Sequence, residues 1–439
     1  MSWYFILFGG ISMLLGLLLI GFPIFVAFLL LNVIGVVILL GPAGFEMFAN
    51  SIFTTATTGS LSAVPLFILM GEILFESGAM EVLFNSIDRL VGQIRGRQYV
   101  VCIVLSAILG ALSGAAMAVA GLLGRAVFPM MRKRGYNTIL SAGTILAGAS
   151  LDPIIPPSVL AIIIATLAQV STGKMLIAGV IPGLFLSLMF LLYVLFRVYL
   201  DPSLAPAQES ESQDLGNRGS IFMALVRMLP CGFIFFLVMG LVMLGVATPT
   251  EAAATGVFGS LLLAWFYGGL SKKMVMNALH SGVSVAGLLL VVMSCATMFS
   301  QLLTFTGATR ILAEVIVNLH VSSVMMLFTM LAVPFVLFMF LDQVALLMVL
   351  IPIYQSILPV YGFDPIWFWT LLLIVAAVGG LSPPFGYTLF AFKSAVPSLS
   401  MGEIFKAAWP FVWIIVFGIV IMVIFPGIIT LLPAIMATK

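Results

Sequence analysis

The chain has 439 residues, of which 63% are hydrophobic and only 7% are charged, and its formal net charge is +2. A soluble domain carries roughly 25% charged residues, so this composition is typical of a polytopic membrane protein. The small net charge gives no indication of nucleic-acid binding, and the three cysteines lack the spacing of a disulfide framework or a metal site. Apolar runs of about 20 residues recur along the chain, which predicts an all-α membrane protein.

Three spans and a surface arm are predicted first. The spans cover residues 3–20, 23–40 and 61–78, and the less apolar residues 41–60 are expected at an interface. The first apolar run lacks a basic n-region and is followed by further spans, so we interpret it as a retained helix and not as a signal peptide. Residues 79–98 carry apolar side chains at helical spacing among Asp and Arg residues, which predicts an amphipathic arm on the membrane.

The apolar residues 99–131 are predicted to form a re-entrant helical hairpin. They split at the small residues 110–116 into two arms of about 16 residues, and each arm reaches roughly 24 Å, less than the ~30 Å hydrocarbon core. Basic residues flank both ends, with Arg95 and Arg97 before and 132–134 after, so both ends are expected on the cytoplasmic side. The alternative is one long tilted span.

Residues 137–170 are predicted to be one helix with a break in its middle. Pro153, Pro156 and Pro157 remove three backbone donors, and their rings clash with carbonyls one turn back. Asp152 beside them would lie at membrane depth, where a carboxylate and freed carbonyls are costly unless something binds them.

The composition changes abruptly at residues 201–220, which are rich in Pro, Ser, Gln, Glu and Asp. We interpret them as a cytoplasmic linker between a first repeat, 1–200, and a second, 221–439. The second repeat again contains a candidate hairpin, 321–358, and a broken helix, 365–395. The remaining predicted helices are 175–199, 221–246, 251–267, 281–305 and 403–432.

Two local features of the second repeat are predicted in more detail. Thr248 is expected to cap a helix whose first residue is Pro249, and Glu251 is expected to complete a capping box. Residues 271–280, with Lys272 and Lys273, are expected to form a short surface arm.

The distribution of positive charge predicts the orientation of the helices. With both termini on the periplasmic side, all Lys and Arg residues lie in the cytoplasm or at that face except Lys174, Arg310, Lys439 and the hairpin residue Arg125. The second hairpin then enters from the outside, and its flanks are nearly free of Lys and Arg. The two halves therefore have opposite orientation, which predicts two inverted-topology repeats.

The hairpins and the broken helices are expected to meet near the membrane midplane, since inverted repeats are related by an axis in the membrane plane. Broken helices expose carbonyls that suit Na⁺ and helix N-termini that suit a carboxylate. Two breaks facing two hairpins suggest two or more coupling cations, and the sequence has no Walker A motif for ATP. The candidate cation ligands are Ser113, Ala116, Asp152, Ile155 and Pro157 at the first break, and Gly379, Ser382 and Phe385 at the second.

An anionic substrate could be bound by hydroxyl and amide donors near the same breaks. The candidate substrate contacts are Ser113, Ser158, Asp342, Gln343, Thr388 and Lys393, with Ser382 as a further hydroxyl. Each hydroxyl could instead bond only within its own helix packing.

Three charged residues have more than one interpretation. Asp152 could be a cation ligand, a proton carrier or a helix cap, and Asp342 has the same alternatives. Lys393 could neutralise a carboxylate or extend to the cytoplasmic interface. Glu72 is expected in a structural pairing away from the site.

Several motifs resemble the large membrane subunit of tripartite ATP-independent periplasmic (TRAP) transporters, in order and over essentially the whole chain. They are Ser113-Gly114-Ala115-Ala116, Pro129–Tyr136, Ile155-Pro156-Pro157-Ser158, Gly173-Lys174, Ala178–Gly183, Thr248–Ala253 and Ser382-Pro383-Pro384-Phe385-Gly386. The resemblance implies Na⁺-driven import of an organic acid by an elevator-type motion. It also implies a four-helix small membrane subunit, a periplasmic substrate-binding protein and a place in the bacterial inner membrane.

The sequence departs from the family's pattern at a few positions. Ala115 and Ala116 stand where serine is common, Asp152 and Phe338 stand where glycine is common, and Ser382 stands where threonine is common. The resemblance adds Phe338 to the candidate cation ligands, through its backbone carbonyl.

Three other functions remain as alternatives. A stand-alone divalent-anion/sodium symporter would share this architecture. An ion channel would need a continuous polar pore, whereas the hairpins and breaks predict a closed site at the midplane. An enzyme is not expected, because the sequence has no catalytic triad spacing and no His/Cys cluster.

Overall fold

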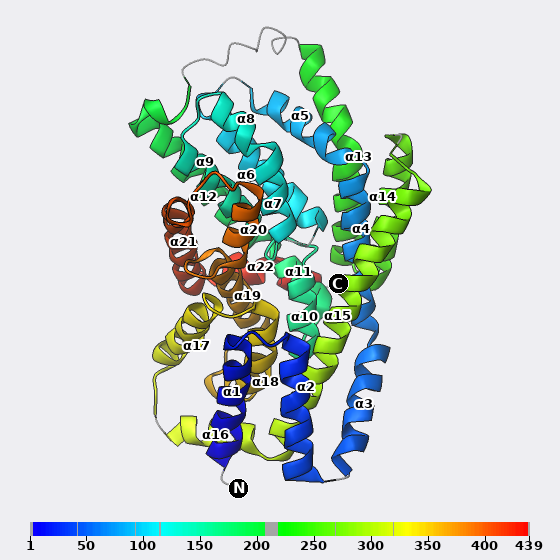
Figure 1. The fold of residues 1–439 in the computed structure, drawn as a ribbon, viewed down its shortest axis with the longest axis vertical. Coiled ribbons are helices and arrows are strands. Elements are labelled where there is room, and N and C mark those ends of the chain that lie inside the picture. Colours follow the sequence, from blue (N-terminus) through cyan, green and yellow to red (C-terminus); the bar gives the residue numbers. More distant parts are fainter. Residues whose placement is uncertain are drawn as a thin grey trace.

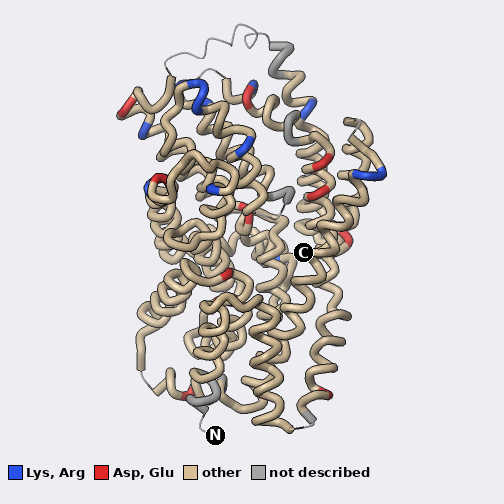
Figure 2. The backbone as a smooth tube through the Cα atoms, in the orientation of Figure 1, with Lys and Arg blue, Asp and Glu red and all other residues tan. Residues whose placement is uncertain are grey.

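The computed structural model describes residues 3–41, 43–92, 94–113, 116–206, 218–267, 269–318 and 320–437. Every regular element in these ranges is a helix, which confirms the all-α prediction. Six of the helices in the described ranges are long and apolar enough to cross a membrane. The molecule is elongated in Figure 1, and its Lys and Arg residues gather mainly toward one end of the long axis in Figure 2.

The helices of the first half follow the predicted order with one addition. Within residues 41–60, expected only at an interface, residues 43–57 form helix α3, which packs against α15. The elements are α1 (Trp3–Leu19), α2 (Ile24–Gly35), η1 (Val36–Leu40), α3 (Ala43–Thr57), η2 (Gly59–Ser62), α4 (Ala63–Glu76), α5 (Ala79–Val91), α6 (Arg97–Ser113), α7 (Ala116–Ala126), α8 (Phe128–Lys133), α9 (Thr138–Ala149), α10 (Val159–Leu167), α11 (Thr172–Ala178), α12 (Val180–Leu200) and η3 (Pro202–Leu204).

The second half differs from the prediction at its third helix, at α16, which was not predicted, and at its end. The elements are α13 (Arg218–Met243), α14 (Pro249–Phe266), α15 (Lys272–Phe305), α16 (Ala308–Asn318), α17 (Ser323–Phe338), α18 (Gln343–Tyr361), α19 (Pro365–Leu381), α20 (Tyr387–Ala395), α21 (Met401–Ile424) and α22 (Gly427–Ala437). The expected surface arm 271–280 is wrong, because α15 continues through it as one helix of 34 residues. The predicted last span is two helices, α21 and α22, separated at Phe425 and Pro426.

Local capping chemistry explains several helix starts. Thr248 accepts a hydrogen bond from the Glu251 backbone N–H, and the Glu251 carboxylate accepts from the Thr248 N–H, so the predicted capping box is confirmed. Asn137 caps α9, Ser158 caps α10 and Asp364 caps α19 in the same way, with the side chain accepting from a backbone N–H of the first turn.

The helices form two groups. We call α6–α12 and α17–α22 the hairpin group, because it contains both helical hairpins and both broken helices. We call α1–α5 and α13–α16 the frame group. Within the hairpin group α9 packs against α21 and α7 against α20, and within the frame group α4 packs against α14 and α15. Figure 1 shows the frame helices α13, α14, α4, α15 and α3 along one side of the molecule.

The two groups meet along several helix pairs, and α5 with α6 and α16 with α18 are among them. Helix α4 of the frame group contacts α6 and α10, and α15 contacts α18. These contacts place one frame helix beside the first hairpin and another beside the second. The candidate site lies along this boundary.

Candidate functional site

The first break lies between α9 and α10 and is fully buried. The residues from Leu151 to Ser158 all lie in the interior, and Asp152 is only 2% exposed. Ser158 organises the break, because its Oγ donates to the Pro153 carbonyl at 2.6 Å and accepts from the Ala161 N–H at 3.1 Å. The peptide bond between Pro156 and Pro157 is cis.

The first hairpin packs directly on this break. Gly110 of α6 lies so close to Asp152 that a Cβ at position 110 would come within 3.0 Å of the Asp152 Cα. Any larger residue at position 110 would require the Asp152 backbone to shift, so this close approach favours glycine. The tip residues Gly114 and Ala115 and the side chain of Ser113 lie outside the described part of the chain, so the predicted roles of Ser113 stay predictions.

The second break, between α19 and α20, is built from the same kinds of contact. Ser382 Oγ donates to the Val378 carbonyl at 2.7 Å, and Thr388 Oγ1 donates across the break to the Gly380 carbonyl at 2.6 Å. Both hydroxyls are buried, and both donate to carbonyls of α19. The peptide bond between Pro383 and Pro384 is cis, as at the first break.

The second hairpin packs on the second break. A Cβ at Gly379 would lie 2.2 Å from the Phe338 Cβ, and the Phe385 N–H donates to the Met339 carbonyl at 3.2 Å. The structure therefore brings together Phe338, Gly379 and Phe385, three of the candidate cation ligands.

A polar contact outside the break motif also joins this hairpin to the broken helix. The Tyr387 hydroxyl at the start of α20 donates to Gln343 Oε1 at 3.1 Å, and Gln343 Nε2 donates to the Ala376 carbonyl of α19. Sequence reasoning missed Tyr387. It follows directly after the Ser-Pro-Pro-Phe-Gly motif, and the position after a break, where a helix starts, was the available signal.

The two hairpins and the two broken helices border one central cavity of about 340 Å³. The frame group closes its other side, through α4 and α15. Its lining residues are Ile68, Glu72, Ala116, Met117, Asp152, Pro153, Ser158, Val159, Leu160, Ile163, Val285, Leu289, Asp342, Gln343, Val344 and Tyr387.

Four helices begin at this cavity. Ala116, Val159, Gln343 and Tyr387 are the first residues of α7, α10, α18 and α20, and all four line it. A helix N-terminus carries about half a positive charge, so their convergence favours negative groups inside the cavity.

Three carboxylates also border the cavity, from Glu72, Asp152 and Asp342, and no Lys, Arg or His is among its described lining residues. Asp342 caps α18, since its Oδ1 accepts from the Val344 N–H at 2.9 Å and the Ala345 N–H at 3.1 Å. Asp342 therefore acts as a helix cap, one of the three roles considered for it. Glu72, expected in a structural pairing away from the site, instead faces it from α4.

Of the candidate residues, Ala116, Asp152, Ser158, Asp342 and Gln343 line the central cavity. The others do not line it, namely Ile155, Pro157, Phe338, Gly379, Ser382, Phe385, Thr388 and Lys393. Lys393 points elsewhere, because its Nζ donates to the Pro397 and Leu399 carbonyls at 2.9 and 2.5 Å. No group of three or more His, Cys, Asp or Glu residues that could hold a metal ion occurs in the described ranges.

Comparison with known proteins gives the family. The sequence profile described as "Tripartite ATP-independent periplasmic transporter, DctM component" matches residues 11–428. The chain belongs to this family. It is therefore a multi-pass membrane protein of the TRAP type, a large permease subunit and not an enzyme.

Three curated relatives match over at least 90% of their own length and are distant in sequence. The chain is 26% identical to the ectoine TRAP transporter large permease protein of Halomonas elongata, over 95% of this chain and 96% of that one. It is 28% identical to the C4-dicarboxylate TRAP transporter large permease protein of Pseudomonas aeruginosa, over 90% and 91%. It is 26% identical to the sialic acid TRAP transporter large permease protein of Vibrio cholerae, over 97% and 98%.

Solved structures of other transporters share the fold. The YdaH transporter of Alcanivorax borkumensis aligns with a TM-score of 0.62 at 16% identity, covering 86% of each chain. MtrF of Neisseria gonorrhoeae aligns with a TM-score of 0.57 at 15% identity, covering 86% of this chain and 82% of that one. At these identities the likeness concerns the fold alone.

Proposed function

We propose that this subunit imports an organic acid together with two or more Na⁺ ions, through the central cavity. The observation that carries the proposal is the convergence of four helix N-termini on a cavity that also contains carboxylates. The N-termini suit the carboxylate of a substrate. The acidic side chains and the carbonyls freed at the two breaks suit hard cations, which coordinate oxygen.

The charge balance of the cavity supports coupling of the anion to cations. An anionic substrate would enter a space that already holds the side chains of Glu72, Asp152 and Asp342. Like charges at close range in a poorly solvated space repel strongly. Na⁺ ions that enter with the substrate would offset this repulsion, so transport of the anion would depend on them.

The cation ligands proposed are the carbonyls around the breaks together with Asp152. At the second break the close packing of Phe338 on Gly379, and the bond from the Phe385 N–H to the Met339 carbonyl, support a compact site there. The hydroxyl hydrogens of Ser382 and Thr388 are donated to carbonyls of α19, but the oxygen lone pairs remain available to a cation.

The motion proposed is of the elevator type, with the hairpin group moving past the frame group. The support is that the cavity lies between the two groups, so a relative displacement would carry its contents from one side to the other. Glu72, Val285 and Leu289 would stay with the frame, whereas the hairpin and break residues would travel with the substrate.

The assembly proposed is the tripartite one, in the bacterial inner membrane with both chain termini in the periplasm. Its other members would be a four-helix small membrane subunit and a periplasmic protein that delivers the substrate. This proposal rests on family membership and on the named relatives, which are TRAP permeases. The two inverted repeats, 1–200 and 221–439 around the linker 201–220, remain part of the same proposal.

The test is reconstitution in liposomes with an inward Na⁺ gradient. The chain alone should not accumulate substrate, and uptake should appear when the small subunit and the substrate-loaded binding protein are added. Robust uptake by the chain alone would contradict the tripartite proposal and favour a stand-alone symporter. Uptake by the full assembly without any Na⁺ gradient would contradict the proposed coupling.

A further inference from the structure

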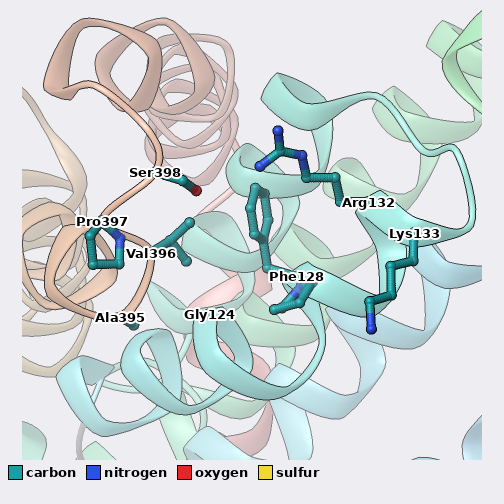
Figure 3. Close-up of a pocket in the computed structure, with 9 residues that line it drawn as sticks. Gly124, Phe128, Arg132, Lys133, Ala395, Val396, Pro397 and Ser398 are labelled. Atoms are coloured by element: carbon teal, nitrogen blue, oxygen red, sulfur yellow. The ribbon is translucent and has the colours of Figure 1, made fainter.

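A second cavity, of about 480 Å³, lies away from the central one, at the end of the molecule where Lys and Arg gather. It opens between the helix pair α7–α8 and the segment that connects α20 to α21. Its lining residues are Gly124, Phe128, Pro129, Arg132, Lys133, Ala395, Val396, Pro397 and Ser398. Figure 3 shows Arg132 and Ser398 on opposite walls, with Phe128 between them.

The walls of this cavity are held together by packing. The Phe128 and Phe392 rings meet edge to face, with centroids 5.6 Å apart. Gly124 lies so close to α20 that a Cβ there would be 3.0 Å from the Ala395 Cβ and 3.1 Å from Phe392 Cδ2. The cavity is therefore preformed by two segments that are far apart in the sequence.

Lys393 shapes the opposite wall. Its Nζ donates to the Pro397 and Leu399 carbonyls, which turns these two acceptors toward the lysine and fixes the connection that carries Ser398. The Lys393 ammonium, a candidate partner for the substrate carboxylate, thus has a structural role here. It also adds a positive charge behind this wall.

The polar residues that line the cavity suit an oxyanion. In the described part of the chain neither Arg132 nor Lys133 forms an ion pair within hydrogen-bonding distance, and both side chains are exposed. Glu403 lies within electrostatic range of Arg132, but its carboxylate already accepts from the Ser400 N–H and Oγ, both at 2.8 Å, in the cap of α21. Arg, Lys and a serine hydroxyl are the donors that proteins use for phosphate.

We propose that this cavity binds a phosphate group, held by Arg132 and Lys133 from α8 and by Ser398 from the connection between α20 and α21. The group belongs either to the headgroup of an anionic phospholipid or to a soluble phosphate compound, since both present the same oxygens. When bound, it ties the end of the first hairpin to the segment after the second broken helix. The proposal does not depend on the substrate or on the coupling ion.

A simpler explanation of these basic residues is that they only orient the chain in the membrane. That role needs charge but neither a cavity nor Ser398. The chain offers a matched comparison in Lys272 and Lys273, an exposed basic pair at the start of α15 that lines no described cavity.

The experiment titrates inorganic phosphate into the purified full-length chain in a neutral detergent, at constant ionic strength, and measures the dissociation constant by calorimetry. Arg132→Gln/Lys133→Gln should weaken binding at least about tenfold, the effect expected from losing charge-assisted hydrogen bonds. Ser398→Phe should weaken it similarly by filling the cavity with every charge kept. Lys272→Gln/Lys273→Gln, which removes the same net charge, should leave the constant nearly unchanged.

A second arm distinguishes the two sources of the phosphate. The chain is placed in nanodiscs of phosphatidylcholine with or without phosphatidylglycerol, and retained lipid is measured by native mass spectrometry for the same variants. Retention of phosphatidylglycerol that is lost in Arg132→Gln/Lys133→Gln assigns the cavity to a lipid headgroup. Binding of free phosphate without lipid retention assigns it to a soluble compound.

Three outcomes would overturn the proposal. They are undetectable phosphate and lipid binding by the unaltered chain, equal losses in the two double variants, and full affinity in both Arg132→Gln/Lys133→Gln and Ser398→Phe. Gel filtration of each variant shows whether it is folded. Ser398→Ala, a milder change at an exposed position, replaces Ser398→Phe if that variant aggregates, with a smaller loss expected.

Discussion

Asp152 illustrates how one residue in this protein carries several possible roles until its surroundings are known. It lies at the first break, is buried, and touches α6 through Gly110. It also lines the central cavity together with Asp342, whose carboxylate caps α18. The two acidic residues therefore border the same space from different kinds of element, one from a break and the other from a hairpin.

We expect Asp152→Asn to weaken the apparent affinity for Na⁺ by about 1–3 kcal/mol while leaving uptake dependent on Na⁺. The reason is that Asn keeps a coordinating oxygen but loses the charge that attracts the cation. The measurement is substrate uptake into proteoliposomes holding all components, under Na⁺ and pH gradients imposed separately. Full activity on a pH gradient without Na⁺, lost in the variant, would mean that Asp152 carries protons.

Glu72 gives a second prediction, because it faces the cavity from the frame group. Glu72→Gln removes a negative charge from the space that would hold an anionic substrate, so the apparent KM should fall by about one order of magnitude. Two charges roughly 10 Å apart at an effective dielectric constant of about 20 repel by about 1.7 kcal/mol. Glu76→Gln, one turn further along α4 and exposed, is the matched control and should change little. A rise in KM for Glu72→Gln would show instead that Glu72 holds a cation.

At the scale of elements, the short turn η3 ties several segments together. The Leu204 carbonyl accepts from the Tyr99 hydroxyl at 2.7 Å and from the Asn137 N–H at 3.0 Å, and Arg95 donates to the Pro202 carbonyl at 2.5 Å. One turn thus positions the start of α6 and the start of α9. The first hairpin and the first broken helix share this anchor.

Asp201 caps η3 and makes this anchor sensitive to pH. Hydrogen bonds from the Ser203 hydroxyl and N–H, at 2.6 and 3.1 Å, lower the pKa of Asp201 below its usual value. A lowered folded pKa means that the carboxylate stabilises the fold above the pKa of the unfolded chain and that this contribution disappears as pH falls through the folded pKa. Asp201→Asn should therefore lower the Tm at pH 7, and the difference from the unaltered chain should vanish in acid.

The measurement for Asp201 is thermal unfolding in detergent over a series of pH values. Because the group is exposed, the effect at pH 7 should be small. A difference in Tm that stayed constant down to acid pH would show that the variant disturbs packing and not the charged cap.

At the scale of the whole molecule, the two helix groups define the surface along which the proposed movement would take place. The frame helices α4 and α15 meet the hairpin group at α6, α10 and α18. The cavity lies at this boundary, so its two sides belong to different groups. Figure 2 adds that positive charge is concentrated at one end, which the positive-inside rule assigns to the cytoplasm.

Labelling of single cysteines tests this orientation. In a chain that lacks Cys102, Cys231 and Cys295, a cysteine at position 210, in the linker outside the described residues, should react only from the cytoplasm. A cysteine at Thr172, at the start of α11, should react only from the outside. The reverse pattern would overturn the orientation derived from charge.

The sequence by itself determined the membrane class, most helix positions and the two breaks, because these depend on local chemistry. Apolar runs of spanning length, prolines without donors and capping residues such as Thr248 and Glu251 act over a few residues, so a linear pattern reveals them. The same reasoning failed at 271–280, where the local charge pattern predicted a separate surface arm. These residues instead belong to the continuous helix α15, which packs against α4 and α2.

Only the tertiary structure decided which residues face one another. Glu72, Tyr387 and the cavity lined by Arg132 and Ser398 depend on contacts between segments far apart in the chain, and no spacing rule encodes such contacts. The same holds for the hydroxyls of Ser382 and Thr388, which donate to carbonyls of α19, and for Lys393, which donates to the segment between α20 and α21. Composition and periodicity show whether a segment must be buried or exposed. Which other segment it packs against is decided by the packing of the whole chain.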